Sequence, residues 1–172
     1  MDVVQGSAPE FGVGLIEAKS RHFREVLGHF STGVVVVTAK GPGGRAGMTC
    51  QSVVSLSLDP PLVLFCPSKA STSWPRMREA GHFCINILAA DQEALASGFA
   101  RSGGDKFVGV DWTPGVTGAP VLAGTLAHVE CTLEAVYDGG DHEIAVGAVV
   151  DLSVRRDTKP LVFFRGSFLE LA

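Results

Sequence analysis

A short stretch of the chain, "CPSKASTSW" from Cys66 to Trp74, concentrates hydroxyl groups beside one lysine. Ser73 is placed to cap a helix that begins next to it, where the first backbone N–H groups have no partner inside the helix. Hydroxyls, an ammonium group and free N–H groups together suit a bound phosphate. An ordinary capped helix would use the same residues, so the stretch leaves both interpretations open.

A glycine pattern earlier in the chain offers a second link to nucleotides. Gly41, Gly43 and Ala46 have the spacing that begins a dinucleotide-binding fingerprint. Such a fingerprint requires a helix directly after the glycines. In the segment 48–56, polar and apolar residues instead alternate and some residues are β-branched, which is typical of a strand. Pro42 also lies within the glycine pattern. We therefore interpret the glycines as a hairpin turn.

The segment after that turn, "GMTCQSVVSLSLDPPLVLF", places small polar side chains between apolar neighbours. Solvated strand faces use such residues routinely. Small polar side chains held between apolar neighbours also argue against a fold with no functional site. The segment is compatible with either interpretation.

Composition and charge exclude several classes of protein. The chain has 172 residues, enough for one domain, and 46% of them are hydrophobic. Its net charge is -4 with no basic block, which argues against nucleic-acid binding. Residues 1–14 contain Asp2 and Glu10 but no Lys or Arg, which is unlike the start of a secretory signal. No apolar run reaches ~18 residues. The scattered cysteines and histidines predict neither a disulfide framework nor a metal site. We expect a cytoplasmic protein that does not bind membranes.

Hydrophobic periodicity predicts mostly strands. Apolar residues spaced at i, i+3, i+4 and i+7 predict an amphipathic helix over 21–30, and shorter helices are expected over 73–80 and 91–100. The Gly- and Pro-rich segment 103–124 is expected to be mostly loop. Strands are predicted over 34–40, 48–58, 62–66, 82–88, 125–137, 142–154 and 161–164.

The connections between these strands decide the fold class. Most of them are too short for a parallel crossover, which needs a dozen or more residues. We predict a mainly β fold, an antiparallel barrel with a few peripheral helices. It would occupy residues 21–172 as one domain, after a flexible N-terminal tail over 1–20.

Several segments, taken in order, resemble the short-chain flavin reductases, the reductase components of two-component flavin-dependent monooxygenases. The resemblance covers Phe23 to Phe168. It implies a split barrel of Greek-key type, a homodimer, and hydride transfer from NADH or NADPH to FAD or FMN. It also implies a partner monooxygenase that receives the reduced flavin. The matching segments are "FREVLGHFSTGVVVVTA", "GMTCQSVVSLSLDPPLVLFCPSKASTSW", "FCINIL", "DKF", "GDHEIAVGAV" and "PLVFFRGSF".

The same resemblance implies two sets of site residues. His142, which follows a Gly-Gly-Asp turn, is the expected catalytic residue and would orient the nicotinamide or steady charge near it. The flavin would contact Ala46, Gly47, Met48, Thr49, Gln51, Ser52, Cys66, Pro67, Ser68, Thr72, Ser73, Phe99, Arg101 and Lys106. The pyridine nucleotide would contact Thr32, Gly33, His142, Phe164 and Arg165.

Some alternatives stay open at this point. Arg101 and Lys106 could be solvated surface charges, and Arg165 could pair with an acidic residue instead of a phosphate. The barrel could carry flavin without catalysis, or serve as an interaction domain with an empty groove. A related split-barrel flavin oxidase, of the kind that includes pyridoxamine phosphate oxidases, is the other enzyme class. The sequence does not separate FAD from FMN or NADH from NADPH.

Overall fold

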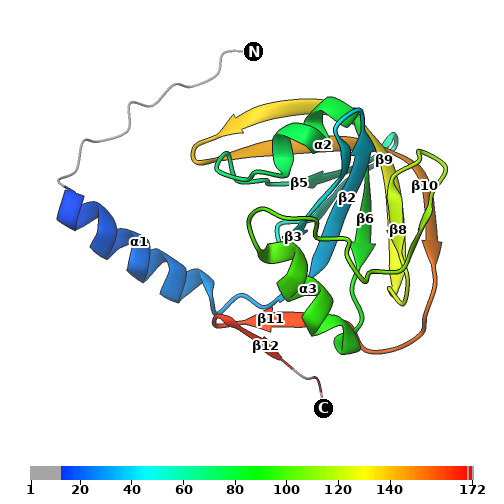
Figure 1. Cartoon of the computed structure of the whole chain (residues 1–172). Helices are drawn as coiled ribbons and strands as arrows, with labels where there is room; N and C mark the ends of the chain where they lie inside the picture. The colour runs from blue at the N-terminus through cyan, green and yellow to red at the C-terminus, as the bar shows by residue number, and fades with distance from the viewer. Residues whose placement is uncertain (1–12, 170, 172) are drawn as a thin grey trace.

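The computed structural model describes residues 13–169 and 171, and it confirms a mainly β, antiparallel fold with few helices (Figure 1). Seven strands form the main sheet in the order β3-β2-β6-β9-β10-β5-β4. Every pairing in that sheet is antiparallel. The strands are β2 (Val35–Gly41), β3 (Gly44–Cys50), β4 (Val54–Leu58), β5 (Pro61–Phe65), β6 (His82–Ile87), β9 (Ala127–Gly139) and β10 (His142–Val154).

The two edge strands of this sheet, β3 and β4, follow one another in the chain. Ser52 lies between them, and its hydroxyl accepts a hydrogen bond from the backbone N–H of Cys66, 3.0 Å away, just after β5. The sheet therefore curls until its edges approach each other. The predicted strand over 48–58 was wrong as one element, because residues 51–53 leave the ladder at this point.

Two hydrophobic cores lie on opposite sides of the sheet. Inside the curl, Phe65 packs edge-on against Trp74 and Phe83, with ring centroids 5.6 and 5.1 Å apart. On the other side, α3 (Glu93–Ala100) packs Phe99 against Val34 and Val36. These cores hold β3 between the inside of the curl and α3.

Helix α2 (Trp74–Ala80) confirms the predicted start and stop signals. Pro75 occupies its first turn, and Gly81 ends it with a φ of +69°. The expected cap by Ser73 was wrong, since its side chain makes no capping hydrogen bond. Its hydroxyl accepts a hydrogen bond from Lys106 instead.

Helix α1 (Val13–Leu27) projects from the sheet beside a small three-stranded sheet (Figure 1). That sheet comprises β1 (Thr32–Gly33), β11 (Val162–Phe164) and β12 (Ser167–Leu169). The helix begins eight residues before the predicted Arg21, within the segment expected to be a tail, and it ends at Leu27, three residues before the predicted Phe30. Residues 1–12 of that expected tail lie outside the described residues.

The Gly- and Pro-rich segment 103–124 is mostly loop, as predicted, and contains one short hairpin of β7 (Trp112–Pro114) and β8 (Pro120–Leu122). The buried Glu130 carboxylate fixes the turn of this hairpin. It accepts hydrogen bonds from the N–H groups of Val116 (2.9 Å) and Thr117 (2.8 Å) and from the Thr117 hydroxyl (2.6 Å). His128 and Asp151 each bring a possible ligand atom within 4.8 Å of this carboxylate, whose oxygens already serve the hairpin turn.

Within the described part of the chain, no helix combines the length and the apolar character that a membrane span requires.

Candidate functional site

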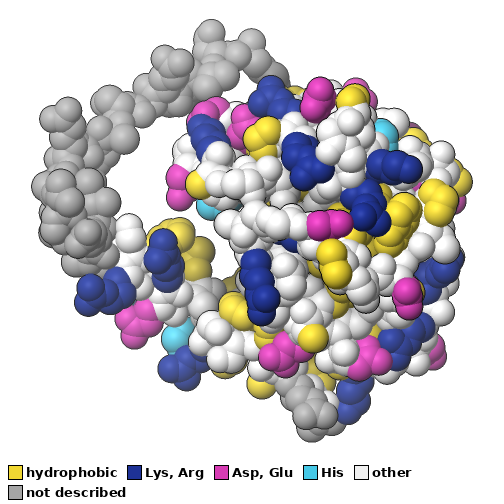
Figure 2. Space-filling model, in the orientation of Figure 1, with side chains coloured by type: hydrophobic (Ala, Val, Ile, Leu, Met, Phe, Trp, Pro, Cys, Tyr) yellow, Lys and Arg dark blue, Asp and Glu magenta, His cyan; other side chains and the backbone are white. Residues whose placement is uncertain are grey.

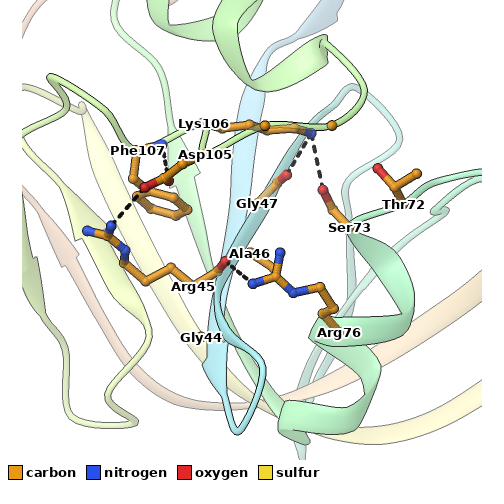
Figure 3. Close-up of a pocket in the computed structure, with 12 residues that line it drawn as sticks. Gly44, Arg45, Ala46, Gly47, Thr72, Ser73, Arg76, Asp105, Lys106 and Phe107 are labelled. Carbon is orange, nitrogen blue, oxygen red and sulfur yellow. Dashed lines mark hydrogen bonds and ion pairs between the residues drawn. The ribbon is translucent and has the colours of Figure 1, made fainter.

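A polar pocket of about 420 Å³ opens between β3, the start of α2 and the loop that carries Lys106 (Figure 3). Three basic side chains and one carboxylate line it. Figure 2 shows Lys and Arg side chains gathered on the face that carries α2. The pocket is lined by Gly44, Arg45, Ala46, Gly47, Thr72, Ser73, Arg76, Gly103, Gly104, Asp105, Lys106 and Phe107.

Lys106 lies at the back of this pocket and donates three hydrogen bonds. Its acceptors are the carbonyl of Gly47 (3.1 Å), the hydroxyl of Ser73 (3.1 Å) and the carbonyl of Phe99 (3.0 Å). Partial burial lowers the pKa of Lys106 below its ordinary value. None of the three acceptors is charged, so the ammonium group keeps its attraction for an anion.

Two arginines complete the rim, and the sequence prediction missed both. The guanidinium of Arg76 donates to the carbonyls of Gly43 (2.5 Å) and Arg45 (2.8 Å). Arg45 pairs with Asp105 at 3.2 Å and lies over the rings of Phe107 and Trp112. Arg76 lies three residues after Ser73, and this spacing is the one signal that could have placed it on the same side of α2.

A second, mainly apolar pocket of about 800 Å³ lies between α1, residues 51–54 and the β11–β12 hairpin. Across it, the hydroxyl of Thr32 donates to the side-chain oxygen of Gln51 at 3.3 Å. The structure thus brings two residues expected near nicotinamide, Thr32 and Gly33, together with two expected near flavin, Gln51 and Ser52. The lining residues are Phe23, Arg24, Leu27, Gly28, Phe30, Ser31, Thr32, Gly33, Gln51, Ser52, Val53, Val54, Phe163 and Gly166.

Strand β3 runs from the polar pocket to the apolar one. Met48 packs partly into the inner core, and its sulfur lies 4.0 Å from the Ser71 hydroxyl. Thr49 points to the other side, where its hydroxyl donates to the carbonyl of Ala96 on α3 at 2.5 Å. The Thr49 hydroxyl is therefore already hydrogen-bonded within the protein, and any ligand contact from Thr49 would come from its backbone.

Seven of the expected flavin residues line neither the polar nor the apolar pocket: Met48, Thr49, Cys66, Pro67, Ser68, Phe99 and Arg101. Phe99 is 1% exposed and packs beneath Gly47, where a methyl group on Gly47 would lie 2.6 Å from its ring. Phe99 reaches the site only through its carbonyl, which accepts from Lys106. Arg101 is exposed just after the end of α3.

The segment from Cys66 to Ser68 joins the flavin set to His142. The carbonyl of Pro67 accepts from the N–H of Glu143 at 2.9 Å, and Ser68 pairs with His142 as an isolated antiparallel bridge. The residues of this segment hold the backbone around the site and line neither the polar nor the apolar pocket.

His142 lies in a third pocket of about 530 Å³, together with Lys19, Ser20, Phe23, Arg24 and Asp141. Its Nδ1 is 2.8 Å from a carboxylate oxygen of Asp141. This hydrogen bond is the main reason that the pKa of Asp141 lies below its ordinary value. Phe23 and Arg24 also line the apolar pocket, so the two spaces adjoin along α1.

The remaining two nicotinamide candidates, Phe164 and Arg165, form the end of β11 and the turn after it. Arg165 has a φ of +49°, and its N–H donates to the carbonyl of Gly28 at 2.9 Å. The ring of Phe164 meets His29 edge-on. The neighbouring residues Phe163 and Gly166 line the apolar pocket in their place.

Comparison with known proteins shows the family to which the chain belongs. The flavin reductase like domain model matches residues 27–172. The reductase subunit HsaB of a flavin-dependent monooxygenase from Rhodococcus jostii is 48% identical over 160 residues, which cover 91% of this chain and 82% of that protein. The FMN reductase (NADH) SmoA of Agrobacterium fabrum is 50% identical over 149 residues, covering 87% and 84% respectively.

A solved structure shows the same fold. The NADH:FAD oxidoreductase SgcE6 of Streptomyces globisporus, in complex with NAD and FAD fragments, superposes with a TM-score of 0.85 at 39% identity. The match covers 90% of this chain and 94% of that one. The family match over 27–172 and these relatives show that the chain belongs to the flavin reductase-like domain family.

Proposed function

We propose that this protein is an NAD(P)H:flavin oxidoreductase whose domain spans residues 21–172, after an N-terminal segment over 1–20. The observation that carries the proposal is the pair of pockets at the two ends of β3, one apolar and one basic. A flavin nucleotide has the matching chemistry, with a flat ring at one end and phosphate at the other. The relatives from Agrobacterium fabrum and Streptomyces globisporus are named as NADH-dependent reductases of FMN and of FAD.

The residues of the two pockets fit such a ligand. Lys106 and the hydroxyls of Thr72 and Ser73 face the space that would hold the phosphate (Figure 3). Gln51 and Ser52 border the apolar space that would hold the ring. Residues 51–54, which line this space, carry no bulky charged side chain, so a flat ring can lie against their backbone.

A bound FAD or FMN supplies the chemistry, by accepting at N5 the hydride that leaves C4 of NADH or NADPH. The protein would hold the two partners in position for this transfer. When the Nδ1–H of His142 donates to Asp141, its Nε2 is available to the nicotinamide carboxamide or to charge near the ring. We assign His142 this orienting role.

The reduced flavin would leave for a separate monooxygenase. This part of the proposal is supported by the names of relatives, since HsaB is the reductase subunit of a flavin-dependent monooxygenase. A cytoplasmic location fits the four cysteines of the chain, which are all free thiols.

We also propose that the protein is a homodimer. Apolar side chains that are more than half exposed gather on α1, at Phe23, Val26 and Leu27, and at the ends of β4 and β10, at Leu58 and Val154. Isolated monomers rarely expose so many large apolar side chains. A second copy of the chain would cover them, and sedimentation analysis at several concentrations would show whether it does.

Steady-state assays test the proposed activity. The purified protein is mixed with NADH or NADPH, and with FAD, FMN or no flavin, while absorbance of the reduced nucleotide is followed. We expect consumption that depends on added flavin. Flavin binding without consumption of either nucleotide would identify a carrier instead, and absence of flavin binding would identify an interaction domain.

A further inference from the structure

Arg24 occupies the boundary between the apolar pocket and the pocket of His142. It lines the first together with Thr32 and Gln51, and it lines the second together with Asp141 and His142. It lies in the last turn of α1, one residue after Phe23, which borders the same two spaces. A ligand that extended from one space into the other would have to pass Arg24.

The charge of Arg24 stands out at this place. Among the fourteen residues that line the apolar pocket, Arg24 is the one with a charged side chain. Its guanidinium forms no hydrogen bond or ion pair with the part of the chain that the structure describes. Its charge does reach Asp141, since it contributes to the lowered pKa of that carboxyl group. Asp141 is, however, already bonded to His142 at 2.8 Å.

We propose that Arg24 binds the pyrophosphate of the pyridine nucleotide, an inference that rests on the proposed function. The nicotinamide ring would lie where the apolar pocket adjoins the pocket of His142, and the phosphates would lie against α1 at Arg24. A guanidinium offers five N–H donors in a planar fork that matches phosphate oxygens. Arg24 is therefore a binding and positioning residue for the hydride donor, and it has no role toward the flavin phosphate, which Lys106 serves.

The test compares Arg24→Ala and Arg24→Lys with Arg21→Ala in the full chain. Arg21 is exposed on the same helix and lines neither pocket. The Kd of NAD⁺ is measured by titration calorimetry on protein saturated with flavin. The kcat/KM is measured with NADH and with N-benzyl-1,4-dihydronicotinamide, which donates a hydride but carries no phosphate.

We expect Arg24→Ala to weaken NAD⁺ binding and to lower kcat/KM for NADH by about 10- to 100-fold, as for loss of hydrogen bonds to a charged group. Arg24→Lys should lose less, because it keeps the charge, and Arg21→Ala should match the unchanged protein. The rate with the phosphate-free donor and the Kd of flavin should stay the same in every variant.

Three results would overturn this inference while leaving the proposed function intact. One is an Arg24→Ala protein that binds NAD⁺ as well as the unchanged protein. Another is an equal loss with both hydride donors, which would assign Arg24 to the fold of α1. The third is a change of oligomeric state in Arg24→Ala, which would place the residue in an interface. Failure of the unchanged protein to oxidise NADH would instead contradict the proposed function itself.

Discussion

Ser68 and His142 pair as an antiparallel bridge, which fastens the hydroxyl-rich loop before α2 to the turn between β9 and β10. Two further bonds strengthen this attachment. The N–H of Lys69 donates to the carbonyl of Asp141 at 3.0 Å, and its ammonium group pairs with Asp138 at 2.5 Å. The segment expected near the flavin and the residue expected near the nicotinamide are thus held in one unit.

The first prediction concerns His142. Its side chain is 44% exposed and contributes no packing to the described cores, so His142→Ala should fold normally. We expect kcat/KM for NADH to fall by about 10- to 100-fold through lost orientation of the donor, with flavin affinity unchanged. Fluorescence titration with flavin and steady-state kinetics measure the two effects. An equal loss of both would show that His142 holds the fold of the hairpin.

The second prediction concerns the phosphate end of the flavin site. Lys106→Met should weaken binding of FMN by about 10- to 100-fold, because the positive charge beside the phosphate is lost. Riboflavin, which has no phosphate, should bind with nearly unchanged affinity. Lys40→Met is the matched control, since Lys40 is exposed and does not line the polar pocket. Equal weakening of FMN and riboflavin would move the phosphate away from Lys106.

A pH dependence follows from the lowered pKa of Lys106. Phosphate binding favours the charged ammonium form, so FMN affinity should be full below this pKa and fall as pH rises through it. The fall should come before pH ~10.4, the value for an unperturbed lysine. The ratio of the Kd values of riboflavin and FMN, measured between pH ~7 and ~10, isolates the phosphate contribution. The same ratio should stay flat in Lys106→Arg, whose guanidinium does not titrate there.

Gly47 provides a stability test of the strand between the two pockets. A methyl group at this position would lie 2.6 and 2.8 Å from carbons of the Phe99 ring. We expect Gly47→Ala to lower the free energy of unfolding by about 1–3 kcal/mol, because α3 must move away. Gly98→Ala on α3 meets nothing within 4 Å and should raise it by about 0.5–1 kcal/mol. Urea denaturation measures both, and a neutral Gly47→Ala would show that α3 adapts freely.

The periodic parts of the fold were predictable from the sequence, and the site only in part. Strong alternation marked β9 and β10, and the Pro and Gly signals marked α2. The end of β3 at Cys50 could not be recognised in the sequence, because small polar residues continue to alternate with apolar ones beyond it. For Arg76 the local signal is limited to its spacing from Ser73, since tertiary packing alone brings the start of α2 against β3.

The set of flavin residues shows the same division. Resemblance to a family identified the segments that form the pockets, and the structure then separated lining residues such as Ser73 from supporting ones such as Phe99. Which residue of a hairpin faces the cavity depends on the twist and packing of that hairpin. In the β11–β12 hairpin, for example, Phe163 and Gly166 line the apolar pocket, whereas Phe164 and Arg165, expected near the pyridine nucleotide, lie between them in the chain.

Rapid anaerobic mixing tests the central claim most directly. The purified protein, saturated with FAD or FMN, is mixed with NADH in the absence of oxygen while the visible absorbance of oxidised flavin is followed. We predict loss of that absorbance in a single turnover, slowed when the transferred hydrogen at C4 of NADH is deuterium. Full retention of the oxidised flavin spectrum with both NADH and NADPH would contradict the account.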